Sequence, residues 1–199
     1  MREALVFVGI GALVIILGVI AINQRFTKSA DNEIMPHIAT MSLTLSSTAF
    51  SATTSIPSEY TCDGGNPPAG GSPPLSIAGA PQGTKTFALI VEDPDVPKQL
   101  KPDGIFLHWV AFNIPGSLTE IVAGAQIGVQ GANGTGKNGY AGPCPPPQYE
   151  PSEHRYVFTL YALDSALPLK AGAKKEDVVK AMEGNILEQS VLIGKYKRK

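Results

Sequence analysis

Short apolar runs separated by Gly, Pro, Asn and Asp repeat along the chain from residue 43 to residue 163. This pattern predicts a mostly β domain, because strands are short and the turns between them favour those four residue types. The last two runs are rich in aromatic and β-branched side chains, which suit a half-buried pleated surface. The predicted strands comprise residues 43–50, 75–77, 86–92, 106–113 and 155–163.

The segment FLHWVAFN at 106–113 predicts which side chains share a face of its strand. Because successive residues of a strand point to opposite faces, His108 is expected among apolar neighbours, where most histidines are packed core residues. One predicted face carries Phe106, His108, Val110 and Phe112, and the other carries Leu107, Trp109 and Ala111.

A different period governs residues 173–190 near the end of the chain. Val178, Met182 and Ile186 recur there at the spacing of one helical face. Gly184 lies within this segment and is the residue at which such a helix would be interrupted. We expect a single C-terminal helix that packs on the sheet.

The first part of the chain has another character, because residues 4–22 contain only Ala, Leu, Val, Phe, Ile and Gly. An apolar run of this length can span a bilayer, and it lacks the polar face of a soluble helix. No signal-peptidase site follows it, so we predict a retained anchor rather than a cleaved signal peptide. The predicted parts are an anchor at 1–22, a tether at 23–42 and a domain at 43–199.

Composition and charge exclude several classes of function. The chain has 16 Lys and Arg against 17 Asp and Glu, so it lacks the positive field of a nucleic-acid-binding protein, and we expect no nucleic-acid partner. Its 2 cysteines lack the CxxC spacing of zinc ribbons and thioredoxin-like proteins. The 21 Gly and 17 Pro favour a turn-rich fold over a helical bundle.

One stretch approaches two known motifs. GANGTGKN at 131–138 matches the phosphate-loop pattern except at Asn138, where Ser or Thr is required, so we reject a nucleoside triphosphate site. The same stretch contains Asn133-Gly134-Thr135, an acceptor pattern for N-glycosylation. The GxSxG motif of serine hydrolases does not occur in the sequence.

Three segments at the ends of the strongest predicted strands hold most of the chemically capable side chains. In DPDVP at 93–97 the prolines hold Asp93 on a stiff turn, and His108 lies on the next strand. GYAGPCPPPQYEPSEHRY at 139–156 has few backbone N–H donors and reaches His154, and a rigid loop of this kind can bind an anion. Alternatively, the aspartate and the two histidines could form a metal site with open positions.

Several of these segments resemble the phosphatidylethanolamine-binding protein family, also called the Raf kinase inhibitor-like family. The segments that resemble its signature are DPDVP at 93–97, HWVAFNIP at 108–115, GYAGPCPPP at 139–147 and HRYVFTLYALD at 154–164. Those that resemble its prokaryotic branch are YTCDGG at 60–65, SPPL at 72–75, GAPQGTKTFALIVEDPD at 79–95 and AMEGNIL at 181–187. The resemblance runs in order over nearly the whole of the predicted domain.

The resemblance implies a mostly β fold of two antiparallel sheets with a C-terminal helix, and a pocket for phosphate-like or carboxylate-like anions. We hypothesise that Asp93 orients His108 or His154, and that the N–H groups of Gly142 and Cys144 complete the anion site. By motif position the ligand-binding residues would be Asp93, Pro97, His108, Tyr140, Gly142, Cys144, Pro145, His154 and Tyr156.

The side of the membrane on which the domain lies is predicted differently by two features. Arg25 and Lys28 follow the apolar run while Arg2 precedes it, which favours a cytoplasmic domain. The resemblance suggests that Cys62 and Cys144 lie close together, and a disulfide between them would favour an oxidising compartment. We expect the domain outside the cytoplasm.

The function that these features favour is a membrane-anchored, non-enzymatic binding protein without a cofactor. Its ligand would be a phosphate, a phosphoryl head group or a carboxylate. One alternative is an inhibitor of a protease or kinase that acts through the protein surface. The other is a metal-dependent hydrolase or lyase that uses Asp93, His108 and His154.

Overall fold

A computed structural model of the protein describes residues 42–65 and 67–198. In these two ranges, no helix combines the length and the apolar character that a membrane crossing requires. The predicted anchor at 1–22 and the predicted tether, up to residue 41, lie outside the described residues.

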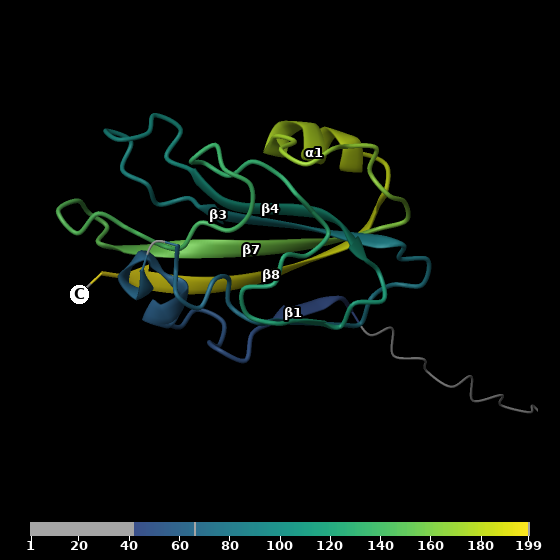
Figure 1. The fold of residues 1–199 in the computed structure, drawn as a ribbon, viewed down its shortest axis with the longest axis horizontal. Helices are drawn as coiled ribbons and strands as arrows, with labels where there is room; N and C mark the ends of the chain where they lie inside the picture. The colour runs from purple at the N-terminus through teal and green to yellow at the C-terminus, as the bar shows by residue number, and fades with distance from the viewer. Residues whose placement is uncertain (1–41, 66, 199) are drawn as a thin grey trace, which may run out of the picture. The chain divides into compact units, whose positions relative to one another are not determined.

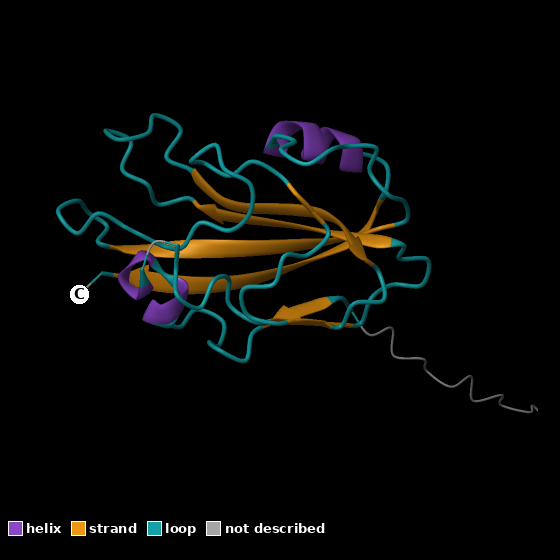
Figure 2. Ribbon diagram, in the orientation of Figure 1, coloured by secondary structure: helices purple, strands orange, loops and turns teal. Residues whose placement is uncertain are grey.

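Two antiparallel sheets and one α-helix make up the domain (Figures 1 and 2). The smaller sheet has the strand order β1 (Thr44–Ser46), β2 (Leu75–Ala78) and β5 (Glu120–Ile121). The larger sheet has the order β6 (Val129–Gln130), β4 (Phe106–Pro115), β3 (Thr86–Asp93), β7 (Glu153–Leu163) and β8 (Ile186–Lys197). The helix is α1 (Lys175–Met182), and two short 3-10 helices span Ser58–Tyr60 and Cys62–Gly64. The expected fold class is thereby confirmed for the described residues.

Each face of the larger sheet buries its own set of apolar side chains. Residues from both sheets form an inter-sheet core, and α1 covers the opposite face of the larger sheet over a helix-side core. The largest fully buried side chains of the inter-sheet core are Trp109, Tyr156, Phe87, Phe158, Ile56, Leu75, Leu89, Ile114, Ile121 and Leu160. The helix-side core comprises Ala88, Ile90, Val110, Phe112, Leu163, Leu167, Val178 and Met182.

The predicted helix at 173–190 is only half correct. α1 ends at Met182, Gly184 has a φ of +78°, and β8 begins at Ile186. β8 pairs with β7 from Leu163 back to Glu153, which gives β7 a second neighbour along its whole length. Tertiary strand pairing therefore overrides the local helical period, and Ile186, which extended that period, is 45% exposed.

The other predicted strands agree with the structure to within a few residues, apart from the first. The run at 43–50 contains only the three-residue strand β1, after which Ser47 leaves the sheet to bind the carbonyl oxygen of Pro74. The two-residue strands β5 and β6 were not predicted, because so short a segment shows no period.

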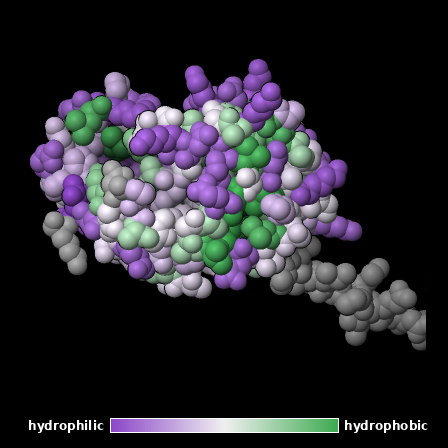
Figure 3. All heavy atoms as spheres, in the orientation of Figure 1, coloured by the Kyte–Doolittle hydropathy of each residue, from purple (hydrophilic) through white to green (hydrophobic). Residues whose placement is uncertain are grey.

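The face seen in Figure 3 is hydrophilic around most of its rim and apolar in a central area. Scattered apolar side chains are normal on a folded protein and do not by themselves indicate a partner. Large apolar side chains that are exposed in the described residues are Leu100, Ile105, Val122, Val179, Ile186, Leu187 and Val191.

Candidate functional site

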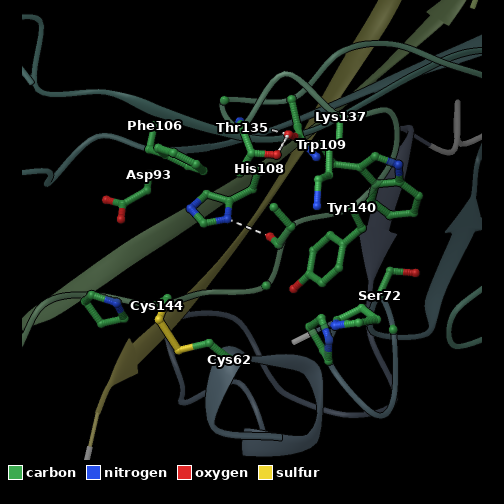
Figure 4. A pocket seen from close by; sticks show the side chains of 18 of the residues that line it. Cys62, Ser72, Asp93, Phe106, His108, Trp109, Thr135, Lys137, Tyr140 and Cys144 are labelled. Carbon is green, nitrogen blue, oxygen red and sulfur yellow. Dashed lines mark hydrogen bonds between the residues drawn. A yellow bond between two sulfur atoms is a disulfide. The ribbon is translucent and has the colours of Figure 1, made fainter. Parts of the chain in front are cut away.

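A cleft of about 1050 Å³ lies beside the ends of β3, β4 and β7 (Figure 4). Its walls come from the loop before β2, the loop between β3 and β4, and the long segment between β6 and β7. The polar and aromatic side chains that line it are Ser72, Asp93, Lys101, Phe106, His108, Trp109, Gln126, Asn133, Thr135, Lys137, Asn138, Tyr140 and His154.

Seven of the nine predicted ligand-binding residues line this cleft, although they come from three separate segments. They are Asp93, His108, Tyr140, Gly142, Cys144, Pro145 and His154. Pro97 is buried within the β3–β4 loop, and its neighbour Val96 lines the cleft in its place. Tyr156 does not line the cleft but supports it, since its ring centroid lies 5.1 Å from that of His108.

A β-bulge in β4 places His108 in the cleft. Val91 of β3 pairs with Trp109, and the next residue, Glu92, pairs with Leu107. His108 therefore has no partner on β3, and β4 contains one residue more than β3 at this point.

The bulge reverses the alternation of side chains along β4. Leu107 packs against the helix-side core with Val110, whereas His108 contacts Tyr156 on the opposite face. The predicted faces are therefore wrong before the bulge, where Leu107 does not share a face with Trp109. Strict alternation would have placed the imidazole of His108 in the helix-side core. The extra residue directs it into the cleft instead.

His154 and Asp93 form a buried hydrogen-bonded pair. The Nδ1 atom of His154 lies 2.7 Å from Oδ2 of Asp93, and their side chains are 1% and 5% exposed. The Nε2 atom of His154 is buried and has no hydrogen-bond partner among the described residues. Burial raises the pKa of the Asp93 carboxyl, and the hydrogen bond from His154 only partly opposes this effect.

Asp95, two residues further along the same turn, has a structural role. The guanidinium of Arg155 donates to both of its carboxylate oxygens, at 2.8 and 2.6 Å, and the Arg155 N–H donates at 2.9 Å. These hydrogen bonds hold the pKa of Asp95 below its usual range. They also fasten the β3–β4 loop to the start of β7, beside His154.

His108 is bound differently from His154. Its Nδ1 atom lies 2.6 Å from the carbonyl oxygen of Ala141, and the Ala141 N–H donates to the carbonyl oxygen of His108 at 2.8 Å. Of the two histidines, Asp93 therefore orients His154. Burial lowers the pKa of His108 to about 4, and the nearby His154 acts in the same direction.

Two tyrosine hydroxyls lie behind the histidines. The Tyr140 hydroxyl donates to the carbonyl oxygen of Tyr60 at 3.0 Å, while the buried Tyr156 hydroxyl has no partner among the described residues. Burial raises the pKa of both tyrosines, and for Tyr156 the charge of Asp93 adds to the effect. Both hydroxyls therefore remain protonated at neutral pH.

The segment 139–147 is held by the loop before β2. The structure joins Cys62 to Cys144 by a disulfide with a Cα–Cα distance of 5.4 Å, and the Cys62 N–H donates to Pro143 at 3.0 Å. Neither the Gly142 N–H nor the Cys144 N–H donates a hydrogen bond within residues 42–65 and 67–198. Two backbone donors are thus available at one wall of the cleft.

Substituting Gly142 with alanine is expected to lower the free energy of unfolding by about 2 kcal/mol. An added Cβ atom would lie 2.5 Å from Cγ of Pro68 and 3.0 Å from the carbonyl oxygen of Tyr60. Urea denaturation measures this cost. In a Pro68→Ala background the same substitution should cost clearly less, and an equal cost in both backgrounds would show that the contact is not responsible.

The three residues considered for a metal site line the same cleft, but they are not arranged as a set of metal ligands. In the described part of the chain, no group of three or more His, Cys, Asp or Glu side chains is placed to hold a metal ion. The Nδ1 atom of His108 is occupied by Ala141, and that of His154 by Asp93. The geometry described here is that of a hydrogen-bonding site.

The rejected phosphate-loop segment contributes to the cleft by another route. Lys137 and Thr135 line the cleft, and Figure 4 shows Lys137 and Tyr140 on one side of His108 and Asp93 on the other. The sequence feature that could have indicated Lys137 as a lining residue is a lysine in a glycine-rich segment next to the GYAGPCPPP loop. Ser72 was also missed as a lining residue, and only its place in SPPL at 72–75 could have indicated it.

The tripeptide that matches the N-glycosylation pattern, residues 133–135, is part of a tight turn. Asn133 is 7% exposed, its Nδ2 donates to the carbonyl oxygen of Gly139 at 2.9 Å, and its Oδ1 accepts from the Thr135 backbone and hydroxyl. Both ends of the amide are thus engaged in the folded domain. The tripeptide shapes the wall of the cleft.

Comparison with known proteins finds relatives that match most of this chain. A family model described as phosphatidylethanolamine-binding protein matches residues 46–197. A UPF0098 protein from Chlamydia pneumoniae is 44% identical over 155 residues, which cover 77% of this chain and 98% of the relative. A UPF0098 protein from Methanothermobacter thermautotrophicus is 45% identical over 163 residues, which cover 78% and 99%.

Solved structures show the same similarity in three dimensions. A putative phosphatidylethanolamine-binding protein homologue from Chlamydia trachomatis is 41% identical with a TM-score of 0.74, and the match covers 80% of this chain and 99% of that one. YbcL from Escherichia coli, described as a new member of the mammalian family, is 26% identical with a TM-score of 0.67. That match covers 79% of this chain and 99% of YbcL.

Proposed function

The chain belongs to the phosphatidylethanolamine-binding protein family, and on this premise we propose that it is a non-enzymatic binding protein for small anions. The ligand is a phosphate, a phosphoryl head group or a carboxylate, held in the cleft beside His154. One observation carries the proposal: the Nε2 atom of His154 is buried at the cleft with no hydrogen-bond partner among the described residues.

A buried polar atom without a partner costs free energy, so an unfilled hydrogen-bonding position in a cleft favours a ligand. Asp93 accepts a hydrogen bond from Nδ1 of His154 and thereby holds the ring in one orientation. The Nε2 atom is therefore the ring nitrogen that remains to bind a ligand. Asp93 thus orients the ring and fixes which nitrogen faces the ligand.

Further donors around the cleft support an anionic ligand. The N–H groups of Gly142 and Cys144 are free of hydrogen bonds within the described residues. Lys137 lines the cleft and forms no salt bridge in the described part of the chain, whereas Lys101 is paired with Asp103 at 2.5 Å. The net charge of −1 means that such attraction is local to the cleft.

The chemistry of the cleft supports binding rather than turnover. Both cysteines are in the disulfide, and neither described histidine is hydrogen-bonded to a hydroxyl or thiol. A hydroxyl or thiol nucleophile is commonly activated by an adjacent base in such a pair. The arrangement instead provides fixed donors around one ligand position.

We also propose that the domain lies outside the cytoplasm and is anchored through residues 4–22. The disulfide supports this location, since disulfides persist mainly in oxidising compartments. The apolar sequence of residues 4–22 supports the anchor. Fractionation of cells, followed by protease treatment of intact spheroplasts, would test both parts.

Binding of inorganic phosphate and of phosphorylethanolamine, measured by isothermal titration calorimetry, tests the proposed ligand class. His154→Phe should lower the affinity for both ligands by about 10- to 100-fold, because a hydrogen bond to a charged group is lost. Tyr161→Phe is the matched control, since Tyr161 is on the same strand but packs on the helix-side core. Undiminished affinity in His154→Phe would contradict the proposal.

A further inference from the structure

Resting on the proposed anion site, we propose that the cleft prefers anions that carry a hydroxyl proton. This narrows the proposed ligands to phosphates that keep a P–O–H group, and carboxylates and other fully deprotonated anions should bind more weakly. Phosphate and phosphate monoester monoanions belong to the first class, and sulfate belongs to the second. The residue that distinguishes them is His108, which faces the ligand with a hydrogen-bond acceptor.

The hydrogen bond between His108 and Ala141 determines the tautomer of the ring. A carbonyl oxygen can only accept, so the proton of that hydrogen bond, with its 2.6 Å distance, belongs to Nδ1 of His108. A neutral imidazole with a proton on Nδ1 has a lone pair on Nε2. The Nε2 atom forms no hydrogen bond within the described residues, so this acceptor is available to a ligand.

The ring cannot easily turn to exchange its two nitrogens. Its centroid lies 4.8 Å from that of Phe106 and 5.1 Å from that of Tyr156, and the residue is 4% exposed. The backbone of Ala141 is fixed to the bulge by its own N–H, which donates to the carbonyl oxygen of His108. Ring, bulge and loop therefore form one rigid unit.

The surroundings of His108 keep it neutral. Aromatic rings pack on it from β4 and β7, and the one from β7 belongs to Tyr156, whose hydroxyl stays protonated. The nearby His154 is already paired with Asp93. Burial and the proximity of His154 lower the pKa of His108 to about 4. At neutral pH its Nε2 atom thus accepts a hydrogen bond and does not donate one.

The two histidines therefore offer complementary groups to one ligand. His108 accepts from a P–O–H group, while the P–O⁻ oxygens face the N–H groups of Gly142 and Cys144 and the Nε2 atom of His154. Sulfate has oxygens of the same arrangement but no proton, so its oxygen would face the lone pair of His108 and leave that acceptor unpaired. Sites built to bind a hydroxyl proton reject analogues that lack it.

Competition between phosphate and sulfate tests this inference in the purified full-length protein. At neutral pH every phosphate ion carries at least one P–O–H group, and the hydrogen phosphate dianion has the charge and shape of sulfate. We expect phosphate to bind about 10- to 100-fold more tightly than sulfate by calorimetry. A site governed by charge alone would bind the two dianions equally.

Two variants separate the role of His108 from general electrostatics. His108→Phe keeps an aromatic ring but removes the acceptor, so the ratio of phosphate to sulfate affinity should fall to about one. Lys137→Met is the matched control, because loss of a charge that lines the cleft should weaken both anions and leave the ratio unchanged.

The tautomer itself can be observed by ¹⁵N NMR of histidine, since the chain has only 3 histidines. His108 should show a protonated Nδ1 and an unprotonated Nε2, and the Nε2 signal should shift when phosphate is added. Equal affinity for sulfate and phosphate, or a proton on Nε2, would overturn the inference while leaving the anion site intact. Failure of both anions to bind would overturn the proposed function and this inference with it.

Discussion

Replacing Cys62 and Cys144 together with serine is expected to lower the free energy of unfolding by about 4 kcal/mol. The disulfide closes a loop of large size, with a sequence separation of 82 residues, and so removes much entropy from the unfolded chain. Urea denaturation of the wild type and the double variant measures the difference. A loss below about 1 kcal/mol would show that the loop is constrained by other contacts in the unfolded state.

The same substitution should also weaken phosphate binding. Cys144 belongs to the wall of the cleft that presents the free N–H groups. Two contacts link this wall to Cys62, namely the disulfide and the hydrogen bond from the Cys62 N–H to the carbonyl oxygen of Pro143. Reduction of the wild type with a phosphine should reproduce both effects. The control is the double serine variant, in which the reductant should change neither stability nor affinity.

Acidification should destabilise the wild type through His108 by about 3 kcal/mol between about pH 7 and pH 4. The pKa of His108 is about 4 in the folded protein against 6.5 in the unfolded chain. A group whose pKa is lower in the folded state contributes its full stability when the pH is above its pKa in the unfolded state. This contribution is lost as the pH falls toward its pKa in the folded state. The unfolded state therefore gains protons first and becomes favoured.

The difference between wild type and His108→Phe isolates this contribution. Urea denaturation at several pH values should give a flatter profile for the variant, with the two proteins diverging between about pH 6.5 and pH 4. The raised pKa of Asp93 acts with the opposite sign, because protonating it in acid relieves a buried charge, and it is present in both proteins. Parallel profiles would show that His108 titrates normally.

The sequence was sufficient to predict the two long strands β3 and β7, which are neighbours in the larger sheet. Residues 86–92 and 155–163 gave strand boundaries close to those of β3 and β7. Their aromatic and β-branched side chains favour one structure both locally and in the packed sheet, so local and tertiary preferences agree. The resemblance of several motifs added the two-sheet arrangement.

Pairing between distant segments could not be predicted from local pattern. Residues 186–190 fit the helical period as well as α1 does, and they form a strand because β7 lies beside them. The bulge in β4 is set by the register between β3 and β4, which no period of a single strand reveals. Both errors arise where the partner strand decides the structure.

For the candidate site, the sequence indicated which residues gather but not how they bind one another. Asp93 was expected to orient one of two histidines, and the choice of His154 depends on where the two strands place their ends. Pro97 and Tyr156 share motifs with lining residues, although neither lines the cleft. The acceptor role of His108 depends on a backbone carbonyl, and a carbonyl leaves no trace in a sequence.

Because His108 is the extra residue of the bulge, the chain could lose this part of the site and still keep the fold. Deleting that one residue would restore regular pairing where Val91 and Glu92 of β3 face the start of β4, and only the second irregularity, between Phe87 and Leu89, would remain. The lost residue is the imidazole that faces the cleft. A single-codon deletion could therefore yield a well-folded descendant that lacks the hydrogen-bond acceptor of His108. The presence of one extra residue in β4 is then a sequence feature that distinguishes relatives that keep the site from relatives that have lost it.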